Sequence, residues 1–488
     1  MSQRSQTDKI VQFSGHQIHH LDIYQPTSNL PPELLLEIFS VILDEWHSQL
    51  LWNNRRLAAL YGPAMMAAHI PPNVLLPITH VCQYWRNVAV HAPTLWTHVT
   101  LNDSLDTMLN RSQRLPISLY WNIQHDGSSY SQEEQLQIRD RLRPHLHRVQ
   151  LLQITSEDDL HVSPQFLLSC HLPSIQDITL TTMNDHRLLI ARELFRVWMK
   201  PDYDGLRRLS VAHVYLPCIR AAIRPSLRHL SIFIPVENVD VTMFLSIIEA
   251  TPLLESLSLV TSGSLPRHLV QELQEPQKII TLLYLRSLQI NTYRLTLIDI
   301  IRHLSYPSTT SVSLDLGSLE DLEIDPDTLA DYLASSLPKD LRRLTLNIDP
   351  FTCKLSGRGL EDTTTPVSCT VYIWQGESEE SMLAFDILAS KFITTSLQSL
   401  DLFIDFCEYN MYLHEAINEK ISSLKDLYIS SIFHLPFTLL PFTEVNSDEC
   451  LYVPAPQLTY LWIYRMEEGD VEALDYILRK RERGWNNA

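Results

Sequence analysis

The hexad Leu206-Arg-Arg-Leu-Ser-Val211 returns with small changes as Leu227-Arg-His-Leu-Ser-Ile232 and as Leu254-Glu-Ser-Leu-Ser-Leu259. In each copy, the last two apolar residues alternate with polar ones, as a β-strand with one buried face requires. The first leucine precedes that strand and turns the chain into it. The same hexad therefore predicts a strand at each of its other clear copies, which begin at Leu285, Leu341, Leu397, Leu424 and Leu458.

Weaker copies fill the intervals between these hexads. With them included, successive copies lie roughly 20 to 35 residues apart, which is the range of leucine-rich repeats and slightly beyond it. Helical patterns such as Met243–Ala250 stand between copies, so each unit reads helix, turn, strand. One unit cannot bury its apolar face alone, whereas stacked units share a continuous core. The weaker copies are Leu146…Val149…Leu151, Ile175…Ile178…Leu180, Val312…Leu314…Leu316 and Val371…Ile373.

The repeats predict an α/β fold, an irregular leucine-rich-repeat solenoid over residues 146–470 with parallel strands inside and helices outside. Its irregularity follows from missing asparagines, because the position that usually carries one holds other residues. Two long stretches without repeats, 351–366 and 436–456, are predicted to be loops and to contact partners, since loops on a rigid array commonly carry recognition. The positions without asparagine are Val214, Tyr293 and Asp349.

Near the N-terminus, the segment Leu30-Pro-Pro-Glu-Leu-Leu-Leu-Glu-Ile-Phe39 predicts a helix that begins at Pro31. Proline holds φ near helical values and lacks an N–H that the first turn cannot use. The following apolar residues have helical spacing and predict a single apolar face. They are Leu34, Leu35, Ile38, Phe39 and Ile42.

A second helix is predicted over residues 78–89, whose apolar positions recur at helical spacing up to the stop at Pro93. Two or three short helices make a thin core, and such a module usually docks on a partner.

The two segments, Leu-Pro-Pro-Glu-Leu-Leu…Ile-Phe and Val-Cys-x-x-Trp-Arg…Pro-x-Leu-Trp, together resemble an F-box domain. The likeness is greatest to the F-box proteins with C-terminal leucine-rich repeats that are abundant in mushroom-type (basidiomycete) fungi. This resemblance implies docking onto a Skp-type adaptor, and through it onto a cullin–RING ubiquitin ligase. The alternative is that the matching side chains only hold the small helices together. Carried over to this chain, the adaptor-facing residues are Leu30, Pro31, Leu34, Ile38, Phe39, Ile78, Val81, Cys82 and Trp85.

The predicted organisation has five parts. Between the two halves of the F-box motif lies an unusually long insertion, which either makes a surface excursion or obstructs the adaptor. The segment after the F-box is expected to include a strand following Pro116, because its apolar residues alternate. The parts are a disordered tail 1–28, an F-box domain 29–100 with the insertion 46–72, a connecting segment 101–145, the repeat array 146–470 and a C-terminal helix or tail 471–488.

Composition restricts the function classes. The chain has 488 residues and a formal net charge of −19, which disfavours binding to nucleic-acid phosphates. No apolar window reaches the length of a membrane span, and the polar start of the chain does not look like a signal peptide. The seven cysteines are an odd number without a Cys-x-x-Cys pair. This usage is typical of reduced thiols in a cytoplasmic or nuclear protein.

The sequence contains no recognisable catalytic constellation, and we expect neither a cofactor nor a metal. His414-Glu415 begins like a zinc-protease motif, but Asn418 stands where the second histidine ligand would be. The leading hypothesis is therefore a non-enzymatic substrate receptor of a Skp–cullin–F-box ubiquitin ligase, whose repeats bind an unknown protein. The alternative is a repeat-based binding module whose F-box acts independently of ubiquitination. An acidic chain favours basic partners in encounter rate.

Overall fold

The computed structural model of the chain describes separate stretches up to residue 318 and chiefly the strands after that. The described residues are 30–43, 75–101, 104–123, 132–156, 170–182, 203–212, 216–234, 240–261, 278–292, 294–318, 331, 333, 343–348, 352–358, 368–374, 391, 397–404, 423–431, 459–464 and 479.

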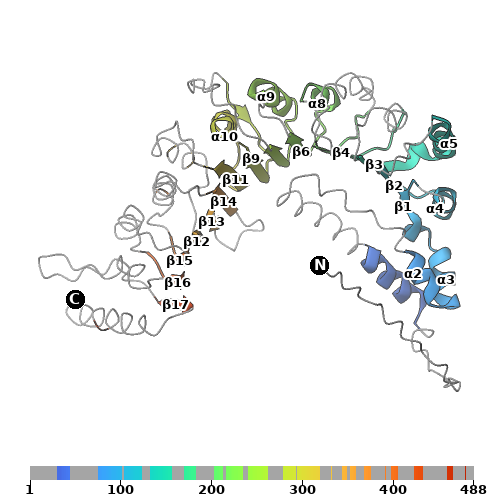
Figure 1. Ribbon diagram of the computed structural model, residues 1–488, viewed down its shortest axis with the longest axis horizontal. Coiled ribbons are helices and arrows are strands. Elements are labelled where there is room, and N and C mark those ends of the chain that lie inside the picture. The colour runs from blue at the N-terminus through green and yellow to red at the C-terminus, as the bar shows by residue number, and fades with distance from the viewer. Residues whose placement is uncertain are drawn as a thin grey trace, which may run out of the picture.

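The described N-terminal part is helical, as the sequence predicts. Residues 32–43 are helical, and the Leu35 N–H donates to the Pro31 carbonyl at 3.2 Å to close the first turn. Helices α2 (Leu75–Val81) and α3 (Gln83–Val90) follow, and then the short 3-10 helix η3 (Pro93–Trp96). These elements lie at one end of an arc of strands (Figure 1).

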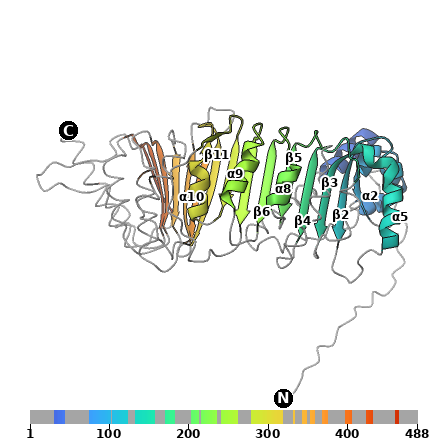
Figure 2. The ribbon, with the colours of Figure 1, turned by 90° about the horizontal axis from the view of Figure 1, so that it is seen from above.

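Fifteen strands form one sheet, in which they lie side by side along the length of the molecule (Figure 2). Its neighbours are parallel from β1 to β11 and again from β12 through β15 to β17. The strands are β1 (His98–Thr100), β2 (Ile117–Ile123), β3 (Val149–Ser156), β4 (Asp177–Thr182), β5 (Arg208–Ala212), β6 (His229–Ile234), β7 (Ser256–Thr261), β9 (Ser287–Asn291), β11 (Ser311–Ser318), β12 (Arg343–Ile348), β13 (Thr352–Arg358), β14 (Ser368–Trp374), β15 (Ser399–Ile404), β16 (Asp426–Ser431) and β17 (Tyr460–Tyr464).

Pairing brings equivalent hexad positions into register, which confirms the predicted solenoid. Leu209 of β5 pairs with Leu230 of β6, and Leu230 pairs with Leu257 of β7. The final hexad residues form a second row, in which Val211 pairs with Ile232. Both rows are buried. They lie on the same face of the sheet, because every second residue of a strand points to the same side.

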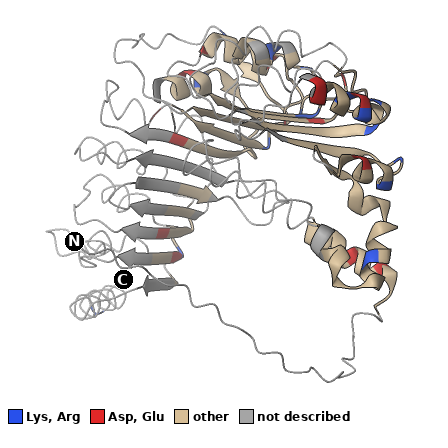
Figure 3. Cartoon of the chain, turned by 45° about the vertical axis from the view of Figure 1, so that its right-hand side comes forward, with Lys and Arg blue, Asp and Glu red and all other residues tan. Residues whose placement is uncertain are grey.

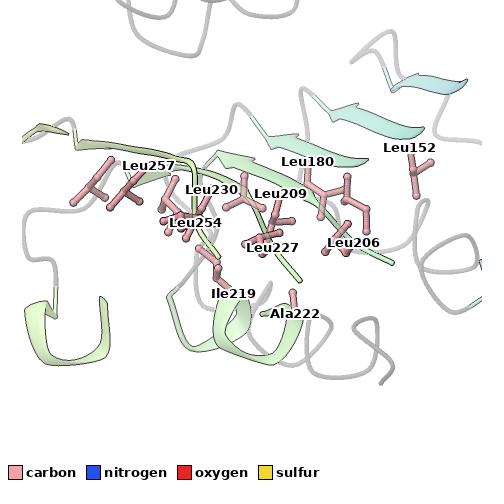
Figure 4. Close-up of a cluster of buried hydrophobic side chains, with 14 of the residues drawn as sticks. Leu152, Leu180, Leu206, Leu209, Ile219, Ala222, Leu227, Leu230, Leu254 and Leu257 are labelled. Atoms are coloured by element: carbon pink, nitrogen blue, oxygen red, sulfur yellow. The ribbon is translucent and has the colours of Figure 1, made fainter. Parts of the chain in front are cut away.

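Helices cover the buried face of the sheet on the outer side of the arc (Figure 1). Leu206, Leu227 and Leu254 point with the strand leucines toward helix α8, where Ile219 and Ala222 complete the core (Figure 4). The predicted helix over 243–250 is confirmed as α9, and its N-cap residue Asp240 accepts from the Met243 N–H at 2.9 Å. The outer helices are α5 (Gln132–Leu142), α8 (Leu216–Ala222), α9 (Val241–Glu249) and α10 (Arg294–Arg302).

A hydrogen-bond ladder joins the repeats where the strands begin. The Arg207 carbonyl accepts the N–H groups of Arg228 and His229, and the Arg228 carbonyl accepts those of Glu255 and Ser256 in the same way. The pattern recurs at the other end of the array, where the Gln398 carbonyl accepts the next repeat's N–H groups from Lys425 and Asp426. Each strand is thereby held to its neighbour before the regular sheet pairing starts.

Hydroxyl groups add a second ladder at the same level. Ser226 donates to the Leu206 carbonyl at 3.0 Å, and Ser423 donates to the Leu397 carbonyl at 2.8 Å. Thr310 donates to the Leu285 carbonyl at 2.7 Å. A polar residue at the entrance of the strand therefore links successive repeats. The three positions at which an asparagine is missing lie outside the described residues.

The prediction of a loop over 351–366 is wrong for its first half. Residues 352–358 form β13, which pairs antiparallel with β12 on one side and β14 on the other. The spatial order is therefore β11-β14-β13-β12-β15, a reversal within an otherwise sequential sheet. The alternation of Cys353, Leu355 and Gly357 with polar residues is the strand signal that a search for the repeat hexad overlooks.

Two further features differ from the expected pattern. The weak hexad at Leu146 is out of frame, because a register shift beside Ile117 places Leu152 and Ile154 in the buried rows and Leu151 on the opposite face. In addition, β8 (Ile280–Thr281) and β10 (Leu304–Ser305) form a separate two-stranded parallel sheet.

The sheet begins N-terminally of residue 146. The strand expected after Pro116 is confirmed as β2, and β1 pairs with it immediately after η3. Helix α4 (Leu105–Arg111) lies between them in the chain. The helical module and the array are thus joined through paired strands. The predicted tail 1–28, the insertion 46–72, the stretch 436–456 and the segment 471–488, except Arg479, lie outside the described residues.

A buried arginine closes this junction. Arg148 ends the 3-10 helix η4 (Arg143–Arg148) and donates to the carbonyls of Leu109 and Leu115 at 2.9 and 3.0 Å. It also donates to the Ser112 hydroxyl at 3.0 Å. These acceptors belong to the C-terminal end of α4 and the turn after it, so the guanidinium group fixes α4 against the start of β3.

Replacing Arg148 with methionine leaves those carbonyls without their donors in a buried site. We expect the substitution to cost about 2–4 kcal/mol of local stability, because buried acceptors lose their partners. Hydrogen exchange of the amides in α4 and β3 measures this effect. The exposed Arg143→Met is the matched control and should leave the exchange rates unchanged. Equal rates in both variants would contradict the assigned role.

His145 makes the junction sensitive to acid. Its Nδ1 lies 3.2 Å from the Arg148 guanidinium, and burial lowers the pKa of His145 below 6.5, with Arg148 lowering it further. The unfolded chain therefore binds a proton more readily, so the stability present above pH 6.5 declines as the pH falls toward the folded-state pKa. The decrease in melting temperature from pH 7.5 to pH 5.5 should be smaller in His145→Gln than in wild type. An equal decrease in both proteins would show that His145 is not the source of the acid sensitivity.

Candidate adaptor-binding surface

The helix of residues 32–43 has two apolar faces, not the single face that the sequence predicts. Leu35, Phe39 and Leu43 are buried. A second apolar stripe points away from them and stays exposed, at 46% for Leu34, 39% for Ile38 and 57% for Val41, with Ile42 also exposed. Contiguous exposed apolar side chains on one helix are typical of a protein-binding surface.

The inner face holds the helix against α3. The Phe39 and Trp85 rings meet edge to face, with centroids 5.2 Å apart. The Tyr84 hydroxyl donates to the Leu30 carbonyl at 2.7 Å, which secures the residue before the helix. These contacts fix which side of the helix faces outward.

The prediction of one helix over residues 78–89 is wrong, because the chain turns at Cys82 and forms two helices, α2 and α3. The Cys82 backbone is extended, and its Sγ accepts from the Trp85 N–H at 3.4 Å as the N-cap of α3. The Arg86 guanidinium donates to the Thr79 carbonyl at 2.8 Å and ties the two helices together. The last turn of α2 places Ile78 in the core and leaves Val81 exposed.

The aromatic end of the module anchors it to the sheet. The Trp96 indole N–H donates to the Ala89 carbonyl at 2.8 Å, and the Arg111 guanidinium lies 4.3 Å from the Trp96 ring centroid. The Ser118 N–H then donates to the Thr97 carbonyl at 2.9 Å. The orientation of the helical module is therefore set by hydrogen bonds and packing that continue into β2.

The F-box-like family model matches residues 27–102. The F-box-like domain thus covers the helical module, with Trp96 and β1, and the sheet of repeat-like strands follows it. Proteins with F-box domains are typically non-catalytic adaptors. No curated protein matches the chain significantly.

Within this F-box-like domain, the candidate site residues fall into two groups. Pro31, Leu34, Ile38 and Val81 are exposed, and Leu30 is half-buried. The second group supports the fold from inside or between helices. It consists of the buried Phe39 and Ile78 and the half-buried Cys82 and Trp85.

The exposed stripe also contains residues that sequence reasoning did not place in the site. Val41 and Ile42 lie one and two turns beyond Ile38 and Leu34 on the same side of the helix, and both are exposed. Their spacing from Leu34, at i+7 and i+8, is the signal that identifies them. It was obscured because the apolar residues of the inner face have the same period.

The inner side of the arc is a second candidate surface, because a large part of it is uncharged. In register across neighbouring strands lie Thr179, Ser210, Ser231 and Ser258, and then Gln289. In the described strands from β1 to β9, the charged residues are Asp177 and Arg208, each the first residue of its strand, and the coloured ribbons carry long stretches without charge (Figure 3).

At the end of this surface next to the F-box-like domain, His98 stacks on Tyr120 with ring centroids 5.8 Å apart. The Tyr120 hydroxyl lies 3.1 Å from the His98 Nδ1. Burial raises the pKa of Tyr120 to about 12, a hydrogen bond with Ser118 opposes this, and Asp177 adds to it. Tyr120 therefore stays a neutral phenol, suited to hydrogen bonding and packing.

Two classes of site are not seen in the described residues. No group of three or more His, Cys, Asp or Glu side chains in that part of the chain is arranged to hold a metal. Among the helices that the structure describes, none has the length and apolar character needed to cross a membrane.

Substitutions on the two faces of the first helix are predicted to change stability by very different amounts. Phe39→Ala should lower the free energy of unfolding of the F-box-like domain by about 3–5 kcal/mol, because it removes a buried ring. Ile38→Ala should change it by less than about 0.5 kcal/mol, because that side chain is largely exposed. Hydrogen exchange of the amides in α3 reports on both variants. Similar destabilisation by the two substitutions would contradict the division into two faces.

Proposed function

We propose that the chain is the substrate-recognition subunit of a Skp–cullin–F-box ubiquitin ligase. Its F-box-like domain would bind a Skp-type adaptor, and its arc of strands would bind a protein target. The observation that carries the proposal is the exposed apolar stripe of Leu34, Ile38 and Val41, which lies within residues matched by the F-box-like model.

The adaptor would contact the outward-facing residues of the F-box-like domain. These are Leu30, Pro31, Leu34, Ile38 and Val81, to which we add Val41 and Ile42 because they continue the exposed stripe. The other candidate residues would act through positioning. Phe39, Ile78, Cys82 and Trp85 hold the three helices so that the stripe is presented as one surface.

In this role the chain contributes proximity and orientation, and ubiquitin transfer takes place on other subunits. Holding two reactants in a fixed relative geometry accelerates their reaction without a bond-making group in the scaffold. The junction at Trp96 supports such a role, because the Arg111 guanidinium packs on the Trp96 ring, the Ser118 N–H donates to the Thr97 carbonyl, and β1 of the domain pairs with β2. A target held on the sheet would keep its orientation toward the adaptor. Such a subunit would work in the cytoplasm or the nucleus.

The proposal is tested by the double variant Leu34→Glu/Ile38→Glu. Two carboxylates on the apolar stripe should weaken binding of a Skp-type adaptor by about ten-fold or more, because they would be buried without partners at the interface. The measurement is co-purification with the adaptor and titration calorimetry of the purified pair. Leu136→Glu, on an exposed apolar position of α5, is the control and should bind normally. Undiminished binding by the double variant would remove this surface from the proposal.

A second measurement separates ligase membership from simple adaptor binding. Cullin should be present in the wild-type complex and absent from the double variant. Adaptor without cullin in the wild-type complex would favour a repeat-based binding module whose F-box-like domain acts independently of ubiquitination.

A further inference from the structure

The side chains at the entrances of β5, β6, β7 and β9 form a continuous surface, which we call the arginine rim. It is lined by Leu253 and Tyr284 before the first hexad leucine, and by Arg207, Arg228, Glu255 and Arg286 after it. These residues occupy two equivalent positions in four successive repeats, directly before and directly after the first leucine of the hexad. Because neighbouring strands of a sheet lie about 4.8 Å apart, equivalent side chains on successive repeats are neighbours.

The rim is locally basic, although the whole chain carries a net charge of −19. From the entrance of β4 to that of β9, the described residues include six arginines, one lysine and five carboxylates. An excess of one sign at a fixed location raises the encounter rate with a partner of the opposite sign. The charged residues of this stretch are Asp177, Asp204, Arg207, Arg208, Arg220, Arg224, Arg228, Asp240, Glu249, Glu255, Lys278 and Arg286.

Two of the carboxylates are already engaged. Asp177 pairs with Arg208 at 3.3 Å, and Glu255 pairs with Arg228. For Arg207 and Arg286, both exposed, the described part of the chain contains no ion pair. Positive charge at this rim is therefore available to a partner.

Apolar side chains replace the hydroxyl ladder at two neighbouring entrances of the rim. Where Ser226 and Ser423 donate to the preceding repeat, the equivalent residues are Leu253 and Tyr284. They are 40% and 56% exposed, and the adjacent Leu283 is 68% exposed. The chain thus gives up a stabilising hydrogen-bond position at two successive repeats and presents apolar surface to solvent there.

The backbone beneath these side chains is already ordered. The Arg228 carbonyl accepts from the Glu255 N–H at 2.7 Å, and the Glu255 carbonyl accepts from the Arg286 N–H at 2.8 Å. Such a preorganised surface loses little conformational entropy when a partner binds. Beyond the rim lie the small residues Ser210 and Ser231, which are in register on neighbouring strands.

We propose that the arginine rim binds an extended segment of the target protein in which acidic residues stand next to apolar ones. The acidic residues would pair with Arg207 and Arg286, and the apolar ones would pack on Leu253, Leu283 and Tyr284. This proposal rests on the proposed function and names the chemistry of its target. It also reverses the preference for basic partners that the net charge of the chain predicts, because recognition depends on the local and not the total charge.

The test uses the full chain with its adaptor bound and two fluorescent peptides of equal length. One peptide alternates glutamate with leucine and phenylalanine, and the other has glutamine in place of each glutamate. Fluorescence anisotropy should give tighter binding of the glutamate peptide, by about ten-fold or more, with a marked decrease at high salt. Equal binding of both peptides, or no binding of either, would overturn the proposal.

Matched variants locate the binding. Arg207→Glu/Arg228→Glu/Arg286→Glu should weaken binding of the glutamate peptide by about ten-fold or more, because attraction becomes repulsion. The control Arg114→Glu/Arg143→Glu/Lys425→Glu reverses three other exposed charges and should bind normally. Equal loss in the two triple variants would mean a general charge effect and would contradict the rim.

The apolar half of the rim is tested by Leu253→Ser/Tyr284→Ser, which installs the residue that other repeats carry at this position. The variant should keep the melting temperature and still bind the glutamate peptide several-fold more weakly. Unchanged binding would remove the apolar contacts from the proposal. Adaptor co-purification from the same preparations reports on the F-box-like domain alone, so a failure there is distinguishable from a failure of the rim.

Discussion

The structure depends on one constraint, namely that each strand buries its two apolar side chains only in register with its neighbours. Leu209, Leu230 and Leu257 form one row, and the final hexad residues form the next. A buried leucine contributes roughly 1.5–3 kcal/mol only when water is excluded from all its sides. A shift of one residue would turn a whole row to solvent. The ladder at the strand entrances holds this register before the sheet begins.

This constraint explains how the array accommodates irregular repeats. At Ile117 a register shift restores the buried rows when the spacing of apolar residues changes. At β13 an antiparallel strand is inserted, and its residues Leu355 and Gly357 still pair with the rows on either side. The rows continue through both interruptions, although the local sequence pattern does not.

The same rigidity gives the N-terminal module its functional meaning. The F-box-like domain presents an exposed apolar stripe at one end of the arc, and the arginine rim lies several strands away on the same sheet. The domain joins the sheet through the pairing of β1 with β2 and the contact of Arg111 with Trp96, and Arg148 then holds α4 against the start of β3. Adaptor and target, as we propose them, would therefore be held by one continuous body, so the distance between them would be set by the fold.

Most strands and their buried rows can be predicted from the order of amino acids, because the hexad has a strand's alternation and recurs often enough to require stacking. The same holds for the helices of the F-box-like domain, whose spacing and proline start are local signals. The folded packing was needed to show which apolar residues of the first helix face outward. Leu34 and Leu35 each belong to a row with helical spacing, and the contact of Phe39 with Trp85 turns the row of Leu35 inward. The tertiary structure also decided the antiparallel place of β13 and the grouping of arginines at the rim. These depend on which residues become neighbours across strands, and the spacing of residues along the chain does not encode that.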